Sequence, residues 1–566
     1  MMASVEQGTA SSALVVLLSL LSAACGTAGG VAHPVESAKV LADNRTLTIA
    51  IPAEPKSLVD RSLQVGPTGS TPGAPGAFFH AALTEYDEKG ILQPALAQGL
   101  PELGTESWKV FADGKMETTW RLRPDLTWHD ASPVLAEDVV LSVQARVKYL
   151  TGGTAGGGAT LKKFVDDVSA VDPLTVVVKW NSPYPDAGQS FWQLLPAHIL
   201  ASPVDQIATP DAFANLPYWT TAFVGLGPYQ LERWEPGAFI EGTSFAGYLR
   251  GRPPIERIRL VWIADPNTAM ANLLSGAVDL TVDGSISFAQ AVVLKQQGWP
   301  GSVLLTPNGD PFLVIQYKLE YQNPRALSDV RVRQALAHGI DKQAIVDLVL
   351  NGEPGFADTI VLPTAPYFPA LEKVLTRYPL DLGRSHQLLD EAGFTEDAAG
   401  FATRGGARLG VEILADHDRE PLILADSWKR IGVDVNLRIR SAQGSLDNES
   451  QSTFPALFLT SGTGDNRDKF RSDAIATAAS NWVGGNRGGY SDPEYDRAYG
   501  ILRTSLDQNV QNQASVDALK LLSDQAAAVP LYYSYDVVAH SPDVTGPIAP
   551  AVAQGVARKV EAWHWQ

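Results

Sequence analysis

Residues 122–142 read LRPDLTWHDASPVLAEDVVLS, and this stretch carries the strongest signal for the fold. Its last part opens a pattern over residues 136–149 in which apolar residues recur at helical spacing, so we expect a helix there. Just before it, Trp128 and Asp130 are typical of one side chain that packs and one that caps a turn. His129 between them resembles a metal ligand, but a zinc site needs several ligands together, so we expect this histidine to be structural.

On both sides of this stretch, β-like runs alternate with helical ones, which predicts an α/β architecture. Glycine or asparagine follows several helical patterns directly, at Asn351, Gly393 and Gly432, where a helix end favours left-handed backbone. The strand-like runs are residues 45–51, 174–180 and 255–263, and the further helical patterns are residues 269–274, 330–337, 341–350 and 384–392.

The composition narrows the possible functions. The chain has 566 residues, a formal net charge of -18 and a single cysteine. One cysteine excludes a disulfide scaffold and a cysteine-based metal cluster. The acidic balance argues against nucleic acid and anionic lipid as partners, because both need clustered Lys and Arg. The length predicts two to four domains, at ~150 residues each.

The beginning of the chain is typical of a targeting segment. Residues 13–24 (ALVVLLSLLSAA) are apolar but too short to span a bilayer, which suits a signal peptide over residues 1–24. Small residues before Cys25 resemble the bacterial lipobox, so we expect Cys25 to be lipidated, followed by a flexible tether over residues 25–44. An ordinary secretory signal is the alternative.

A search for catalytic patterns finds neither a phosphate loop nor a GxSxG elbow nor an HExxH helix. Residues 225–228 (GLGP) begin like a dinucleotide fingerprint, but Pro228 breaks that pattern and a turn entering a strand fits better. The histidines are dispersed. The chain therefore reads as a binding protein rather than an enzyme, without a cofactor or a metal.

The opening stretch resembles the signature LRxxxxWHDGxPxxAxDVxxS of the extracellular solute-binding proteins that serve peptide and nickel ABC importers, with Ala131 in place of Gly. Seven further segments resemble this family in the same order. They are residues 83–97, 225–237, 265–279, 329–352, 378–394, 490–496 and 530–533.

The resemblance implies a type II periplasmic-binding-protein fold of the large class, with two α/β lobes and a two-strand hinge. The first lobe is expected to contain residues 45–310, with a subdomain at about 60–215, and residues 537–566. The second lobe is expected to contain residues 311–536. A ligand is expected between the lobes, which close around it and are then recognised by a permease.

The resemblance also suggests ligand contacts. Residues 463–468 (TGDNRD) are similar to the GDNxD segment of the dipeptide-binding protein, which implies that Asp465 binds the ligand's ammonium group; a solvated loop is the alternative. In residues 481–490 (NWVGGNRGGY), Trp482 can form a wall and Arg487 can grip a carboxylate, with Asn486 beside them, although an exposed loop arginine is equally open. In the first lobe, Phe78, Phe79 and His80 follow a Gly/Pro-rich segment of the kind that lines the cleft.

The resulting hypothesis is a monomeric lipoprotein on the outer face of the bacterial cytoplasmic membrane or in the periplasm. It captures di- or oligopeptides, or similar amine-bearing solutes, for an ABC importer. Other ligands remain open: a metal chelate, haem, a sugar or an antibiotic. A hydrolase or a peptide-sensing signalling partner is the alternative from a different class.

Overall fold

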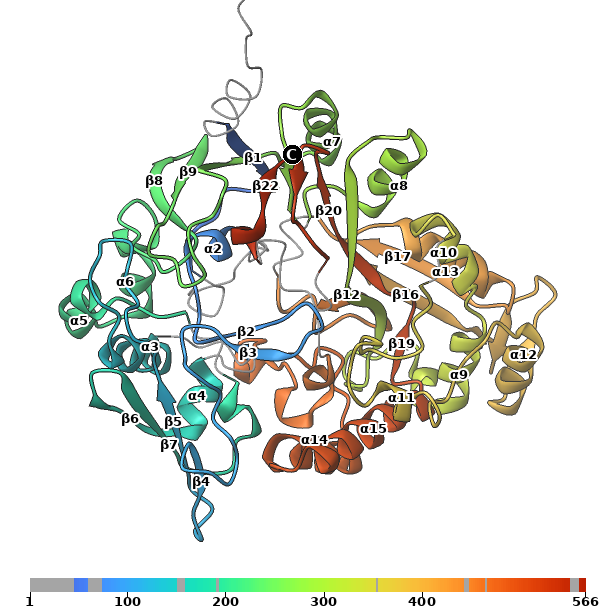
Figure 1. Cartoon of the computed structure of the whole chain (residues 1–566). Coiled ribbons are helices and arrows are strands. Elements are labelled where there is room, and N and C mark those ends of the chain that lie inside the picture. Colours follow the sequence, from blue (N-terminus) through green and yellow to red (C-terminus); the bar gives the residue numbers. More distant parts are fainter. Residues whose placement is uncertain are drawn as a thin grey trace, which may run out of the picture. The chain divides into compact units, whose positions relative to one another are not determined.

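One mixed β-sheet joins half of the described strands (Figure 1). The computed structural model describes residues 45–59, 74–149, 158–189, 193–282, 284–352, 355–441, 447–463, 466–549 and 559–566. In this part of the chain the strand order is β17-β16-β18-β12-β20-β11-β1-β10-β9-β8, with β19 beside β12. The predicted signal peptide, Cys25 and the tether lie outside the described residues.

The first lobe is built around β1 (Thr46–Ile51), whose alternating sequence buries Leu47, Ile49 and Ile51 in one core. β1 pairs in parallel with β10 (Arg257–Trp262) and β11 (Leu280–Thr281), and β9 (Phe239–Ser244) and β8 (Tyr229–Glu235) extend the sheet antiparallel. The helices of this lobe are α2 (Ala74–Phe79), α5 (Ala197–Gln206), α6 (Pro210–Ala214), α7 (Pro266–Ser275) and α8 (Phe288–Gln296).

A smaller four-stranded sheet belongs to the subdomain that contains the opening stretch. Its order is β4 (Trp108–Val110), β5 (Met116–Arg121), β7 (Thr175–Trp180) and β6 (Val165–Asp172). α3 (Ala136–Tyr149) contacts this sheet and α4 (Gly158–Phe164). The hairpin of β2 (Thr84–Tyr86) and β3 (Leu92–Pro94) precedes β4 in the sequence. Trp120, Trp128 and Trp180 share its core.

Two strands connect the lobes. β12 (Ser302–Ile315) pairs in its first part with β20 (Ser534–His540), and in its second part with β18 (Leu457–Thr463) and β19 (Ala528–Pro530). The register shifts at a bulge between Pro307 and Gly309. At Gly309 the neighbouring strand lies so close that a Cβ atom would stand 2.0 Å from the carbonyl oxygen of Gly462. Only glycine fits where β12 passes from one lobe to the other.

The second lobe places helices on both faces of its part of the sheet. β16 (Gly410–Ala415) is parallel to β17 (Asp434–Ile439) and β18. Along β12, Leu313 and Ile315 enter one core, whereas Phe312 and Val314 enter another on the opposite face. The helices are α9 (Val330–His338), α10 (Lys342–Val349), α11 (Phe368–Leu371), α12 (Leu382–Glu391), α13 (Arg419–Lys429), α14 (Pro493–Thr504) and α15 (Gln508–Asp524), and a small sheet contains β13 (Thr395–Glu396), β14 (Ala402–Arg404) and β15 (Ala407–Arg408).

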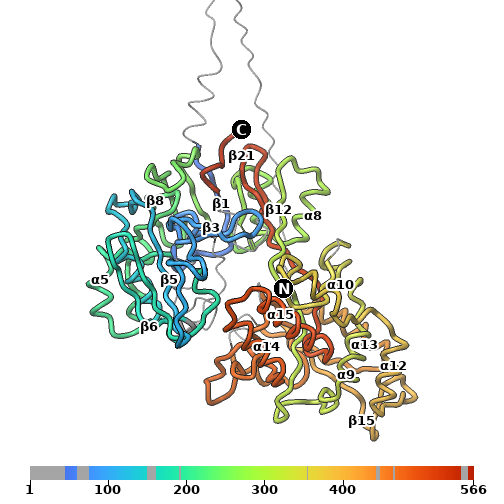
Figure 2. Tube along the Cα trace, turned by 60° about the horizontal axis from the view of Figure 1, so that its bottom comes forward, coloured from blue at the N-terminus to red at the C-terminus, as the bar shows by residue number. Residues whose placement is uncertain are grey.

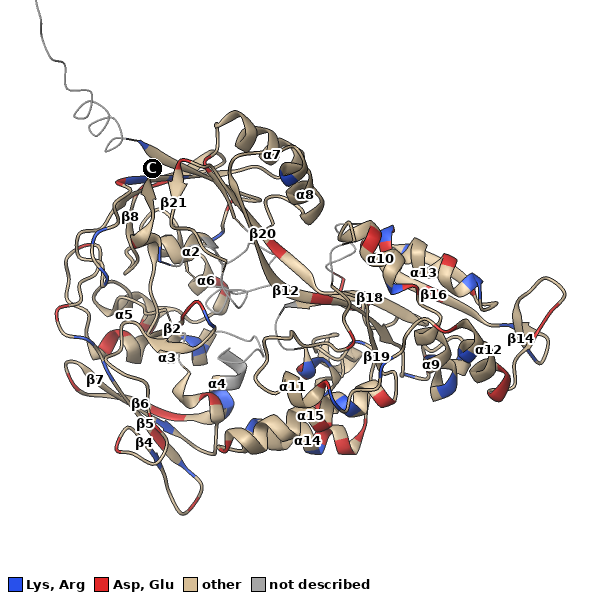
Figure 3. Cartoon of the chain, turned by 45° about the vertical axis from the view of Figure 1, so that its right-hand side comes forward, with Lys and Arg blue, Asp and Glu red and all other residues tan. Residues whose placement is uncertain are grey.

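After the second lobe the chain returns to the first. Val544 of β21 (Val544–Thr545) and Trp563, next to β22 (His564–Trp565), share a core with Leu47 of β1, and Figure 2 shows β21 close to β1. Acidic and basic residues are interspersed on α10, α12 and α13 (Figure 3). Among the described residues, no helix has the length and apolar character needed to cross a membrane.

The predicted helix ends agree with the backbone. Gly393 and Gly432 have φ angles of 84° and 73°, and Asn351 has a φ of 48°. The predicted helices over residues 269–274, 330–337, 341–350 and 384–392 correspond to α7, α9, α10 and α12, with bounds shifted by a few residues. Local sequence signals therefore set these elements.

Candidate ligand-binding site

His129 in the opening stretch is buried and fully engaged by backbone groups. Its Nδ1 accepts the N–H of Gly225 at 3.2 Å, which leaves Nε2–H to donate to the carbonyl of Gly227 at 3.0 Å. Burial lowers the pKa of His129 to about 4, so the ring is neutral at pH 7. The prediction that His129 is structural is confirmed, and the residues 225–228 form the turn that precedes β8.

Asp138 of α3 organises the same region, and sequence reasoning did not single it out. Its Oδ2 accepts the indole N–H of Trp128 at 3.1 Å and the backbone N–H of Leu135 at 2.8 Å. Its Oδ1 accepts the N–H of Ala197 at 2.7 Å. Ala131 adopts a φ of 68°, a conformation that favours glycine, which explains the Gly in the family signature at that position.

Phe78, Phe79 and His80 lie in the interior of the first lobe. The two phenylalanine rings have no exposed surface and belong to the core around β1. His80 Nδ1 accepts the N–H of Ala81 at 3.0 Å, Nε2 donates to the carbonyl of Leu194 at 2.9 Å, and burial lowers its pKa to about 3. We therefore do not retain these three residues as candidate ligand contacts.

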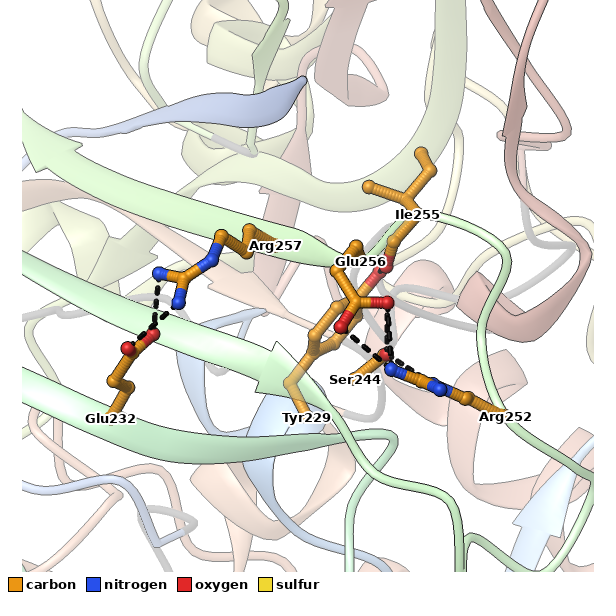
Figure 4. Close-up of polar contacts among 7 residues, drawn as sticks. All are labelled: Tyr229, Glu232, Ser244, Arg252, Ile255, Glu256 and Arg257. Atoms are coloured by element: carbon orange, nitrogen blue, oxygen red, sulfur yellow. Dashed lines mark hydrogen bonds and ion pairs between the residues drawn. The ribbon is translucent and has the colours of Figure 1, made fainter. Parts of the chain in front are cut away.

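Two arginine–glutamate pairs lie at the start of β10 in the first lobe (Figure 4). Arg257 holds Glu232 with two bonds of 2.7 and 2.9 Å. Arg252 holds Glu256 at 2.6 and 2.7 Å. Each guanidinium is neutralised by its own carboxylate. Arg257 uses both terminal nitrogens, in the bidentate geometry that arginine favours, whereas Arg252 uses Nη2 for both oxygens.

The candidate segment of the second lobe follows β18 and contains the short helices η6 (Arg467–Phe470), η7 (Ser472–Ala474) and η8 (Ala478–Ser480). Asp465 lies outside the described residues. Asn466, the next residue, is buried and donates to Asp310 Oδ1 of β12 at 2.7 Å. A side chain on Gly462 would overlap the Asn466 amide, so glycine is required there. The segment is thus anchored to the sheet directly after residue 465.

Asn486 is buried and makes four bonds to backbone groups. Its Nδ2 donates to the carbonyls of Arg471 at 2.8 Å and Tyr490 at 2.7 Å. Its Oδ1 accepts the N–H groups of Gly489 at 2.8 Å and Tyr490 at 3.1 Å. Both amide hydrogens and both lone-pair directions of the oxygen are used, so Asn486 shapes the turn rather than contacting a ligand.

Trp482 and Arg487 lie together and are partly accessible. Arg487 Nη1 donates to the carbonyl of Trp482 at 2.7 Å, and Nη2 donates to Asn448 Oδ1 at 2.9 Å. The indole ring of Trp482 meets the ring of Tyr321 edge to face at 6.2 Å, and Lys318 Nζ lies 5.6 Å from the indole centre. The structure therefore adds Tyr321 and Lys318 to the predicted pair.

Neither of two surface cavities coincides with this region. The larger, about 420 Å³, is lined by residues of α12 and β13, including His386, Asp390 and Glu396. The other, about 340 Å³, is lined by Glu54, Trp234 and their neighbours in the first lobe.

Comparison with known sequences identifies the family. The sequence model of the bacterial extracellular solute-binding proteins, family 5 (middle region), matches residues 100–481, so the chain belongs to this family. A protein of Brucella ovis, named as a candidate ABC transporter peptide-binding protein, is 26% identical over 354 residues, which cover 62% of this chain and 63% of the relative. The haem-binding protein A of Haemophilus influenzae is 25% identical over 487 residues, which cover 80% of this chain and 81% of that protein.

The fold is that of the two-lobed type II periplasmic binding proteins. The oligopeptide-binding protein of Thermus thermophilus, solved with a pentapeptide, superimposes with a TM-score of 0.72 at 19% identity, over 92% of this chain and 96% of that chain. The predicted α/β fold class is confirmed.

Proposed function

We propose that this protein captures di- or oligopeptides, or similar amine-bearing solutes, between its lobes for delivery to an ABC importer. The observation that carries this proposal is the pairing of Trp482 with Arg487 in the anchored segment that begins next to Asp465. The peptide-binding relatives support the same conclusion.

The chemistry of a peptide suits these residues. A peptide ammonium enclosed between lobes loses its water, and a carboxylate such as Asp465 replaces those contacts. The guanidinium of Arg487 can hold the peptide carboxylate, and the indole of Trp482 provides an apolar surface beside it.

Calorimetry of the purified full-length protein with a panel of di- to pentapeptides tests the proposal. We expect Asp465→Ala to weaken peptide affinity at least about tenfold, or ~1.4 kcal/mol, whereas Asp426→Ala on the exposed side of α13 leaves it unchanged. An absence of heat with every peptide would refute peptide binding, and an unchanged affinity of the Asp465 variant would remove that residue from the site.

Haem is the second candidate ligand, because the relative from Haemophilus matches most of the chain. A titration with haem, followed by its absorbance spectrum, separates this alternative. Saturable binding of haem, together with no measurable binding of any peptide, would favour haem as the ligand.

We also propose that Cys25 is lipidated and holds the protein at the outer face of the cytoplasmic membrane. The support is the position of the only cysteine directly after the apolar segment of residues 13–24. Mass spectrometry of the protein from membranes should find a diacylglycerol on Cys25, and Cys25→Ala should release the protein from the membrane fraction. An unmodified Cys25 in the membrane-bound protein would contradict the anchor.

A further inference from the structure

Three basic side chains gather in the second lobe, and we call Lys318, Lys469 and Arg487 the basic cluster. Arg487 lies in the chain between two glycines that pack on the lysines. A methyl group on Gly485 would lie 3.8 Å from Lys469 Cγ. On Gly489 it would lie 2.4 Å from Lys318 Cγ. The loop therefore packs on the stems of both lysines, and the charge of Arg487 acts on both ammonium groups. All three side chains are half-buried.

The basic cluster has no neutralising partner within the described part of the chain. None of the ion pairs found there, at N–O distances up to 4.0 Å, includes any of its three members. Asp310 and Asp468 act on Lys469, and Glu320 acts on Lys318, only as more distant charges. Burial lowers the pKa of Lys318 to about 8, and the charge of Arg487 adds to this effect. Burial likewise lowers the pKa of Lys469. Burial and neighbouring positive charges both disfavour the charged form of a lysine, and a bound anion nearby stabilises that charged form.

The lysines also retain donors for a ligand. Lys318 Nζ donates to the carbonyl of Ala476 at 3.1 Å, and Lys469 Nζ donates to the carbonyl of Ser461 at 3.3 Å. An ammonium group has three N–H donors, so within the described residues each lysine keeps two for other acceptors.

Arg440 provides an independent sign of an incomplete site. Its side chain is only 7% exposed, and one nitrogen pairs with Asp416 Oδ1 at 2.6 Å. Among the residues that the structure describes, its buried Nε and Nη1 find no acceptor. Its charge contributes, after burial, to the lowered pKa of Arg487, so the two guanidinium groups are electrostatic neighbours. Buried N–H groups without acceptors are costly, and a ligand anion is the kind of group that can relieve that cost.

We propose that the basic cluster, with Arg440 behind it, is a subsite for two negative charges of one ligand, so the preferred solute is an acidic peptide or another small dicarboxylate. The inference rests on the proposed function, whose single peptide carboxylate would neutralise Arg487 alone. A second carboxylate is then required for Lys318 and Lys469. This assigns a charge preference that the general capture of peptides does not require.

Calorimetry with Ala-Ala-Glu and Ala-Ala-Gln tests the inference, because these peptides match in shape and differ by one charge. We expect the purified full-length protein to bind Ala-Ala-Glu at least about tenfold more tightly. Lys318→Met and Lys469→Met should each move this ratio toward one while changing the affinity for Ala-Ala-Gln much less. Lys373→Met removes an exposed charge from the same lobe and should leave the ratio unchanged.

The outcomes separate the two proposals. Equal binding of the two peptides by the wild-type protein overturns the charge preference while peptide capture stands, and this comparison needs no variant. Binding of glutarate without either peptide supports the subsite and overturns peptide capture. Binding of none of these probes overturns the dicarboxylate preference, and the wider peptide panel then decides peptide capture.

Discussion

The opening stretch of the first lobe and the basic cluster of the second lobe treat polar groups in opposite ways. Around α3, Asp138 accepts three N–H groups and His129 uses both ring nitrogens. In the second lobe, Lys318 and Lys469 each use one donor for a hydrogen bond within the described part of the chain. The residues that mark the family most clearly therefore have their hydrogen bonds satisfied by the protein itself, whereas the groups that we propose for a ligand lie in less regular sequence.

The arginines give the same contrast. Arg252 and Arg257 in the first lobe each hold a carboxylate with two short bonds (Figure 4). Among the described residues, Arg487 in the second lobe donates only to neutral oxygen atoms, including the carbonyl of Trp482. Arg487 thus differs from Arg252 and Arg257, and in the proposed function a ligand carboxylate takes the place of their glutamate partners.

The largest expected effect tests the architectural role of Asp138. Asp138→Ala leaves the buried indole N–H of Trp128 and two partly buried backbone N–H groups without their acceptor, so we expect the free energy of unfolding to fall by about 3 to 5 kcal/mol. Urea denaturation measures this change, with Glu137→Ala on the exposed side of α3 as the matched control. Equal free energies of unfolding for the two variants would mean that the hydrogen bonds of Asp138 do not stabilise the fold.

A smaller effect is expected from acid. The folded pKa of His129, about 4, lies below its ordinary value of 6.5, so its contribution to stability is present above pH 6.5 and is lost as the pH falls toward 4. Between pH 7 and pH 5 this loss amounts to about 2 kcal/mol. Denaturation at both pH values should show a smaller loss for His129→Gln, which can still bond to the backbone of residues 225 and 227. The same loss in the variant would mean that other groups cause the acid sensitivity.

The third expected effect is a pH dependence of peptide affinity that arises from Lys318 in the basic cluster. Lys318 has a pKa of about 8, so it is charged at pH 7 and mostly neutral at pH 9. The affinity for Ala-Ala-Glu should therefore fall by up to about tenfold across this range. Lys318→Met should show a weaker dependence on pH in the same titration. An identical pH dependence in the variant would assign the titration to another group.

The sequence predicted the fold well because its signals are local. The helix of residues 136–149 and the glycine ends at Gly393 and Gly432 depend on neighbouring residues alone. The signature also predicted part of the packing, because His129 makes its hydrogen bonds to the turn at residues 225–228. That turn belongs to another of the segments that resemble the family.

The candidate site was harder to predict because it depends on distant contacts. A Gly/Pro-rich neighbourhood suggested that Phe78 and Phe79 line the cleft, but tertiary packing buries both rings. The sequence around Asn486 suggested a ligand contact, but its side chain is used by backbone groups, including the carbonyl of Arg471. The basic cluster joins Lys318, Lys469 and Arg487 from separate parts of the sequence, and the overall charge of -18 gives no sign of it.

The passage of β12 and β20 between the lobes also has a consequence for the order of folding. Ser302 pairs with His540, although the whole second lobe lies between these residues in the chain. The first lobe therefore cannot complete its central sheet until β20 has been synthesised. The second lobe is nearly continuous in sequence, so it is expected to fold first and bring the ends of β12 and β20 together. Ligand capture would then depend on the slow, long-range pairing that unites both lobes in one sheet.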